Sequence, residues 1–540
     1  MTGLAEFFES YYRLRPVNAT FTGVHDHDYR LPDWSPEGLT AAVGEMRQLS
    51  SALAAVAQDV LGAVALAKAA SPADRDLAIA FLDIQIAEHE SLHFQRGNPS
   101  LAIGEVAFGV ISLMTRPFTA VDVRAAAAAA RLAAADGFLA GACRSIADGV
   151  PDIWREKALR ECDGVERLLR SGIARWIDEE SIAPALAGDL VRGAESAGAA
   201  LDTFRAWLRQ APAASEDRIA CGSDFFDMLL ARGHCCDRTR RDLAKEAKGA
   251  LDDALVRLDA QAREVTSGGW PEVLQRLAAD VPASNAYLPT YERIWEECRQ
   301  LSVRRQLVTW PEFPIRYVHL PAPTRDAAPF LYYLHYRSPA PFDNLAVHDY
   351  VVPASATISA IKLNHVVHHG AIGHHVQNFF AYRGSSEIGR VAAVDCASRI
   401  GMFCGGTMAE GWACYATDLM DEFGFLTADE SMSQQHTRAR LLARAVVDIG
   451  LHERSLTFDE AVAVYRDRIG MSPDAAQSEA CKNSMFPGAA IMYWLGTDRI
   501  HQLRRARARI EGAAFSLRAF HDRLLSFGAI PVPLIARVWT

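Results

Sequence analysis

The sequence has few cysteines and no excess of positive charge. Its ten cysteines are spread over 540 residues without a Cys-x-x-Cys spacing, which argues against a disulfide-stapled fold and is typical of reduced thiols in a cytosolic protein. The formal net charge of −10 argues against a nucleic-acid partner, because phosphate binding needs a basic face. The sequence also contains no run of like charges of the kind that indicates an interaction tail.

Two features of exported or membrane proteins are also missing from the sequence pattern. The residues from Met1 to Glu9 include no basic region followed by an apolar run, so they do not resemble a signal peptide. The most apolar segment, residues 121–143, is interrupted by Arg124, Arg131 and Asp136, which favours a helix of a soluble protein over a membrane span. We therefore expect a cytoplasmic protein with no membrane partner.

The pattern that is present predicts a mainly α-helical fold with a small β-sheet. From residue 1 to about 300, apolar residues recur at three- and four-residue spacing. Prolines then cluster, and short β-rich runs at 315–318, 330–336 and 348–352 predict a few strands. We divide the chain into an N-terminal helical region, 1–300, and a region with the small sheet and further helices, 301–540. No Pro- or Ser-rich linker separates them, so we expect one packed body.

The most informative segment holds five of the 17 histidines, all between residues 365 and 375. Clustered imidazoles near neutral pH indicate a metal site, since neutral imidazole is a common metal ligand. On a straight helix His365 could share a face with His369, whereas His368 and His374 would be about a third of a turn out of line. A break at the intervening glycines would bring His374 back beside His368. Spacing alone leaves these pairings open.

A metal site that keeps a position open for substrate needs a third protein ligand. The best candidate is Glu410, which opens a helical segment just after Gly405 and Gly406.

These segments resemble the bacterial domain-of-unknown-function family numbered 885, which is grouped with thermolysin-like zinc metallopeptidases. The resemblance rests on residues 368–377, on Glu410-Gly411-Trp412-Ala413, and on further segments from residue 15 to residue 531. It implies a metallopeptidase-like helical fold with a small sheet next to the metal-binding helix and a deep cleft between two helical halves. It also implies that His368, His374 and Glu410 bind one divalent metal. That metal is expected to be zinc, with iron or manganese as alternatives.

One residue at the expected reaction centre departs from the family. In thermolysin-like hydrolysis a Glu beside the first ligand takes a proton from the metal-bound water, and here that position is His369. We therefore expect a metal-dependent enzyme that has diverged from peptide hydrolysis and acts on a small molecule, such as an amino-acid-derived metabolite, as a lyase, isomerase or oxidase. Two alternatives stay open: a zinc peptidase or amidohydrolase with His369 as general base, and a non-catalytic protein that retains the metal.

Further polar residues complete the predicted site for a small-molecule or short-peptide substrate. Beside His369, the predicted catalytic groups are Tyr493 and His452, which could stabilise an oxyanion. Two residues are expected to support the ligand imidazoles from behind, Asp448 and His375. Three residues are predicted to contact substrate: Lys482, His335 and Tyr336.

Overall fold

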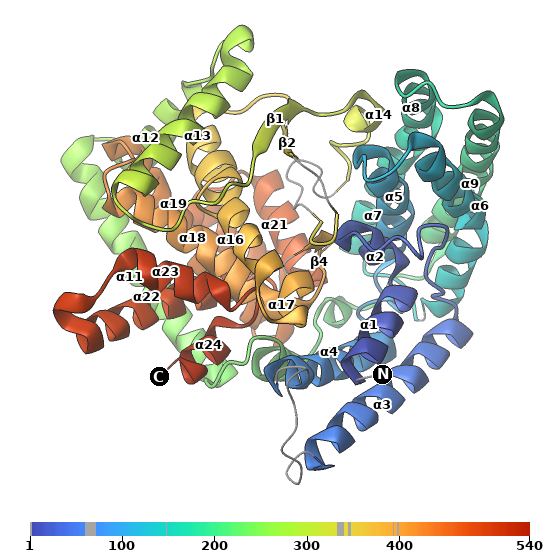
Figure 1. Ribbon diagram of the computed structural model, residues 1–540, viewed down its shortest axis with the longest axis horizontal. Helices are drawn as coiled ribbons and strands as arrows, with labels where there is room; N and C mark the ends of the chain where they lie inside the picture. Colours follow the sequence, from blue (N-terminus) through green and yellow to red (C-terminus); the bar gives the residue numbers. More distant parts are fainter. Residues whose placement is uncertain are drawn as a thin grey trace.

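The computed structural model describes residues 3–59, 72–146, 148–331, 340–343, 347–392, 394–396 and 399–539. It is mainly helical with a small sheet, as predicted (Figure 1). The helices before residue 305 are α1 (Gly3–Leu14), α2 (Pro16–Thr22), α3 (Pro36–Asp59), α4 (Pro72–Glu90), α5 (Pro99–Thr115), α6 (Val121–Ser145), α7 (Asp152–Arg167), α8 (Ile173–Glu179), α9 (Pro184–Gln210), α10 (Ser223–Met228), α11 (Arg240–Val265), α12 (Gly269–Ala279) and α13 (Tyr287–Arg304).

The helices after residue 305 include those that carry the histidine segment. They are α14 (Ala322–Arg325), α15 (Ile358–Ala360), the π-helix η6 (Ile361–Gly370), α16 (His374–Arg383), α17 (Glu387–Ala392), α18 (Gly406–Glu422), α19 (Ala428–His452), α20 (Phe458–Ala463), α21 (Pro473–Met485), α22 (Met492–Glu511), α23 (Leu517–Ser526) and α24 (Val532–Val538). In Figure 1, α5, α6, α7 and α9 lie together on one side of the molecule, and α16, α18, α19 and α22 lie on the other.

The hydrophobic core is continuous between distant parts of the sequence. One buried cluster contains Phe7 and Phe81 together with Ile388, Trp412 and Leu524, so α1 and α4 pack with helices of the last third of the chain. A second cluster fills the space between α5, α6, α7 and α9. Burying apolar surface in this way is the main favourable contribution to folding.

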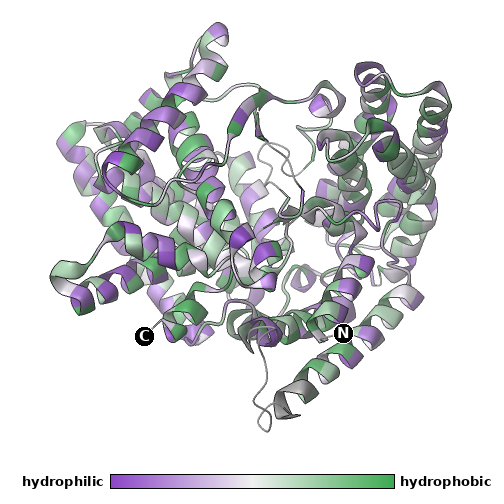
Figure 2. Cartoon of the chain, viewed as in Figure 1, coloured by the Kyte–Doolittle hydropathy of each residue, from purple (hydrophilic) through white to green (hydrophobic). Residues whose placement is uncertain are grey.

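Helix α6 contains the apolar segment noted in the sequence. By length and composition it could cross a membrane, and half of its most apolar 18-residue stretch is buried inside the fold. It packs along α9 and α5, and α5 is itself almost entirely buried. The hydrophobic colouring of these helices in Figure 2 follows this core.

Two of the three predicted strand segments form the small sheet. Strand β1 (Ile315–His319) pairs in parallel with β2 (His348–Val352), with Ile315 opposite His348. In the third segment, Phe330 and Leu331 lie in a turn, and the rest falls outside the described residues. A short antiparallel pair, β3 (Asp395–Cys396) and β4 (Arg399–Ile400), was not predicted. Tyr350 of β2 has its ring 6.2 Å from the rings of both His365 and His369, so the sheet lies beside η6.

Two glycines allow α18 and α22 to approach closely. A Cβ atom added at Gly411 would lie 2.5 Å from Gly496 Cα, and one added at Gly496 would lie 2.0 Å from the Thr407 carbonyl oxygen. Because Gly411 directly follows Glu410, this packing fixes the height and direction of the Glu410 side chain.

The variant Gly411→Ala is expected to lower the free energy of unfolding by about 1–3 kcal/mol, since the added methyl group forces the two backbones apart. Denaturant unfolding measures the change. Gly249→Ala in α11 is the matched control, because a Cβ there meets nothing within 4 Å. It should raise the free energy of unfolding by about 0.5–1 kcal/mol through helix propensity. Equal effects of the two substitutions would contradict the proposed close contact.

Candidate metal centre

The helix break that the sequence allowed between His368 and His374 is present. The π-helix η6 ends at Gly370, and α16 begins at His374. A Cβ at Gly373 would lie 1.9 Å from the His368 carbonyl oxygen, so the chain can turn back this tightly only with glycine there. The indole Nε1 of Trp412 donates hydrogen bonds to the carbonyl oxygens of Ile372 (2.9 Å) and Gly373 (3.2 Å). These bonds fasten the break to α18.

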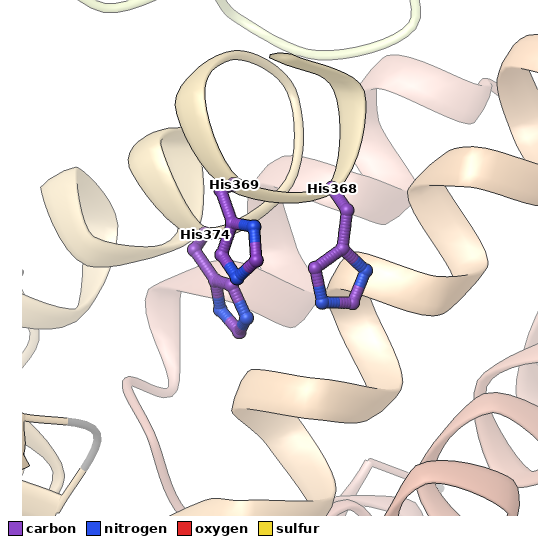
Figure 3. Close-up of side chains that lie close together, drawn as sticks. All are labelled: His368, His369 and His374. Carbon is purple, nitrogen blue, oxygen red and sulfur yellow. The ribbon is translucent and has the colours of Figure 1, made fainter. Parts of the chain in front are cut away.

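Three imidazoles converge at this break, as Figure 3 shows. The ring centres of His368 and His374 lie 4.9 Å apart, and one nitrogen from each of His368, His369 and His374 lies within 4.8 Å of the other two. Glu410 reaches them from α18, and its Oε2 atom lies 3.5 Å from Nε2 of both His368 and His374. Three helices, η6, α16 and α18, therefore bring four potential metal ligands together.

The 3.5 Å separations fit a shared cation. They exceed the 2.7–2.9 Å that is typical of a charge-assisted N–H···O hydrogen bond. Tetrahedral ligands that are each about 2.1 Å from zinc lie about 3.4 Å from one another. The donor set and its spacing are thus those of a site that could hold a divalent metal.

His369 presents its Nε2 atom to this cluster. Its Nδ1 atom lies 3.0 Å from the carbonyl oxygen of Asn364, and a carbonyl oxygen can only accept a hydrogen bond. Nδ1 therefore carries the proton, and Nε2 keeps a lone pair that can bind a metal or accept a proton.

The protein surroundings keep these groups in the forms that bind metals. Burial lowers the pKa of His368, although the Glu410 carboxylate opposes this effect. Burial and the two neighbouring imidazoles lower the pKa of His369 well below its ordinary value. Burial alone would raise the pKa of Glu410, but His368 and His374 hold it well below the ordinary value. Neutral imidazoles and a charged carboxylate are the states that metal binding requires.

The cluster opens into a cavity of about 630 Å³, a size typical of small-molecule sites. Both parts of the chain line it: Gln85, His89 and Glu105 from the N-terminal helices, and the cluster with α19, α21 and α22 from the C-terminal part. Two of the predicted site residues outside the cluster, Tyr493 and Lys482, also lie on its wall.

Three other predicted site residues lie elsewhere and bind backbone groups. His452 is fully buried. Its Nδ1 accepts a hydrogen bond from the Cys221 amide at 3.2 Å, and its Nε2 lies 3.0 Å from the Asn483 carbonyl oxygen. Burial lowers the pKa of His452 to about 4. The structure thus places this imidazole in a packing role.

Asp448 and His375 likewise contact backbone groups away from the cluster. Asp448 accepts hydrogen bonds from the amides of Gly488 (3.0 Å) and Ile491 (2.9 Å), and burial raises its pKa to about 7. It therefore fixes the turn that leads into α22. The Nε2 atom of His375 lies 2.6 Å from the Phe313 carbonyl oxygen, which joins α16 to the segment before β1. His335 and Tyr336 lie outside the described residues.

Of the charged residues on the cavity wall that were not anticipated, three lie together near Lys482: Arg440, Arg444 and Glu479. A signal for two of them is present in the sequence, because Arg440 and Arg444 stand one helical turn apart in a segment of helical pattern.

Comparison with known proteins identifies a family and a shared fold. The sequence matches the family "Bacterial protein of unknown function (DUF885)" over residues 16–538. No curated protein matches it. A structure from Shewanella oneidensis, described as a "putative lipoprotein of unknown function", superposes with a TM-score of 0.75 at 17% identity, over 99% of this chain and 98% of that one. A "putative lipoprotein" from Colwellia psychrerythraea superposes with a TM-score of 0.76 at 16% identity and the same coverage.

These neighbours correct the expected location. Both are described with the words "putative lipoprotein", and a lipoprotein is held at a membrane by its lipid. The prediction of a cytoplasmic protein, which rested on the cysteine pattern and the N-terminal composition, is contradicted by this finding and is not kept.

The variant Trp412→Phe is expected to loosen the helix break while keeping most of the buried ring. Loss of the indole donor should lower the free energy of unfolding by about 1–2 kcal/mol, because the two carbonyl groups lose a buried partner. The substitution should also speed hydrogen exchange of the Gly373 amide, which in the wild-type protein donates a hydrogen bond to the Val367 carbonyl oxygen. The control is Trp270→Phe, since Trp270 is only half-buried. Unchanged exchange at Gly373 would show that the indole does not hold the break.

Proposed function

We propose that this chain, which belongs to the bacterial DUF885 family of unknown function, is a metal-dependent enzyme that acts on a small molecule. In this proposal His368, His374 and Glu410 bind one divalent cation at the bottom of the cavity. His369 stands beside them as a fourth ligand or as the group that exchanges a proton with substrate. The cavity wall supplies the remaining recognition.

The observation that carries the proposal is the position of Glu410 Oε2, 3.5 Å from both imidazole Nε2 atoms. A carboxylate placed only to accept hydrogen bonds from the two rings would approach more closely. The observed spacing leaves the middle of the cluster for an ion. Zinc, iron and manganese all accept imidazole and carboxylate ligands.

The proposal includes descent from thermolysin-like zinc peptidases, with His369 in place of their catalytic Glu. A bound divalent metal would polarise a substrate oxygen and lower the pKa of a bound water. The fixed tautomer of His369 turns a lone pair toward the same point, so the side chain can bind the ion or accept a proton. The ligand role is favoured because the His369 ring lies close to the rings of both His368 and His374.

Peptide hydrolysis with His369 as the general base is the second candidate. It is supported by the hydrogen bond from Nδ1 to the Asn364 carbonyl oxygen, since an imidazole held in this way is oriented for base catalysis at Nε2. The two candidates differ in the reaction, because only the second predicts that the wild-type protein cleaves peptides.

Metal analysis of protein purified without added metal tests the centre. We expect about one divalent ion per chain, and Glu410→Gln should weaken its affinity at least tenfold because the charged ligand is lost. His369→Ala should also weaken it about 10- to 100-fold if His369 is a ligand. The control His319→Ala changes an exposed histidine of β1 and should leave the affinity unchanged. Folded wild-type protein that takes up no metal would refute the proposed function.

Peptidase assays separate the two candidates. The wild-type protein with one equivalent of zinc is expected not to cleave short peptides. His369→Glu restores the carboxylate base of thermolysin-like enzymes and should produce measurable cleavage. If the wild-type protein cleaves peptides and His369→Ala abolishes cleavage without loss of metal, the peptidase reading replaces the one proposed here.

A further inference from the structure

We propose that Arg440 and Arg444, together with Lys482, form a subsite that binds an oxyanion group of the substrate, either a carboxylate or a phosphate. This inference deepens the proposed function by naming the substrate class. It rests on that function only in assuming that the other end of the substrate reacts at the metal centre.

Helix α19 lines the cavity with one side along much of its length. The lining residues are spaced by one helical turn or less: Gln434, Thr437, Arg440, Leu441 and Arg444. Residues three and four apart on a helix are neighbours on one face, so both guanidinium groups project into the same space. Lys482 and Glu479 face them from α21, and Tyr493 faces them from α22.

Arg444 already has partners. It forms an ion pair with Glu479, and its guanidinium lies 5.1 Å from the centre of the Tyr493 ring. Burial opposes ionisation of Glu479, yet the Arg444 guanidinium holds its pKa at about 2. This pair is therefore charged on both sides and well fixed, and it forms a rigid edge of the subsite.

Arg440 is left without such a partner. Its Nε atom is buried and makes no hydrogen bond, and no ion pair of Arg440 occurs among the residues that the structure describes. Burial and the nearby Arg444 lower its pKa, which reflects the unfavourable placing of one cation beside another. Arg440 therefore shares the nearby carboxylate, Glu479, with Arg444; two cations beside one carboxylate, partly withdrawn from water, are unfavourable, and a ligand anion would relieve this.

The balance of charge at this end is positive. Glu479 is the carboxylate that acts on both arginines, and Lys482 also acts on Glu479. In the described part of the chain, the two guanidinium groups thus share one carboxylate, which leaves room for an anionic group of a ligand. Guanidinium groups bind the oxygens of carboxylates and phosphates in pairs, so both ligand groups share the chemistry that this subsite offers.

Helix α18 indicates how far this subsite lies from the metal centre. Its residues Glu410, Cys414 and Thr417 line the cavity at spacings of four and three, so they follow one face of the helix away from the centre. Arg440 and Arg444 line the same cavity as Cys414, which stands four residues, or about 6 Å along the helix axis, from Glu410. A substrate with a few carbon atoms between its reacting group and its anion would span both.

Matched hydroxamates test the subsite in the metal-loaded protein. The monohydroxamate of glutaric acid and pentanehydroxamic acid share a metal-binding head and a chain of equal length, and they differ only in a terminal carboxylate or methyl group. By titration calorimetry, wild-type protein should bind the carboxylate form at least about tenfold more tightly. A phosphonate-tailed analogue, compared in the same way, tells whether carboxylate or phosphate is preferred.

The variant Arg440→Met should remove this preference and leave the affinity for pentanehydroxamic acid unchanged. Arg440→Lys keeps the charge without the planar fork and should retain part of the preference, so the test holds even if the methionine variant folds poorly. Arg509→Met, which changes an exposed arginine of α22, is the matched control. Equal binding of the two tails to wild-type protein, or a preference that survives Arg440→Met, would overturn the proposal.

Failure of the metal site gives a separate result. Glutarate alone needs no metal, and its binding to protein treated with EDTA can be measured on the same variants. If the protein holds no metal but glutarate still binds to wild type and not to Arg440→Met, the subsite stands and the proposed function falls. If metal binds, but glutarate does not bind and the charged hydroxamates bind no more tightly than pentanehydroxamic acid, the metal centre stands and the subsite falls.

Discussion

Three imidazoles with nitrogens within 4.8 Å of one another, next to a carboxylate 3.5 Å from two of them, set the conditions for the rest of this structure. Groups brought this close away from water lose hydration, and the imidazoles repel one another once protonated. The fold must hold them together against that tendency. A bound cation would turn the same arrangement from unfavourable to favourable, because every donor would then face a positive charge.

The backbone around the cluster is built to keep this geometry. The π-helix widens the turn that carries His368 and His369, and the tight reversal at Gly373 returns His374 to the same side. Trp412 fastens that reversal to α18, two residues after Glu410. Gly411 in turn lets α18 lie against α22 at Gly496. The short motif Glu410-Gly411-Trp412 thus supplies a potential ligand, a close helix contact and an anchor for the opposite ligands.

The sequence predicted the parts of this arrangement that depend on local pattern. Helical periodicity gave the fold class, β-rich runs gave β1 and β2, and the histidine spacing with its glycines indicated a break. The local pattern offered Glu410 only as a candidate, and the family resemblance made it a predicted ligand, because a residue 36 positions after His374 has no local signal for its place in space. The same limit explains His452 and Asp448. Their partners, Cys221 and Gly488, are chosen by tertiary packing, so sequence pattern did not reveal that both side chains hold backbone groups. Arg440 and Arg444 were overlooked because charged residues on a helix usually face solvent.

The placement of these arginines bears on how an anionic substrate could be selected by a chain of net charge −10. At physiological ionic strength, interactions between exposed charges are largely screened beyond about 8 Å, so the negative surface has little effect deep in the cavity. Within the cavity the field is set by nearby groups. Glu410 would offset only part of the charge of a bound divalent ion, and Glu479 is shared by two guanidinium groups. With the ion bound, both ends would therefore be positive. A molecule with two anionic or electron-rich ends would bind at both ends of the cavity. Binding of one end by the arginines would hold the other, reacting end at the imidazoles.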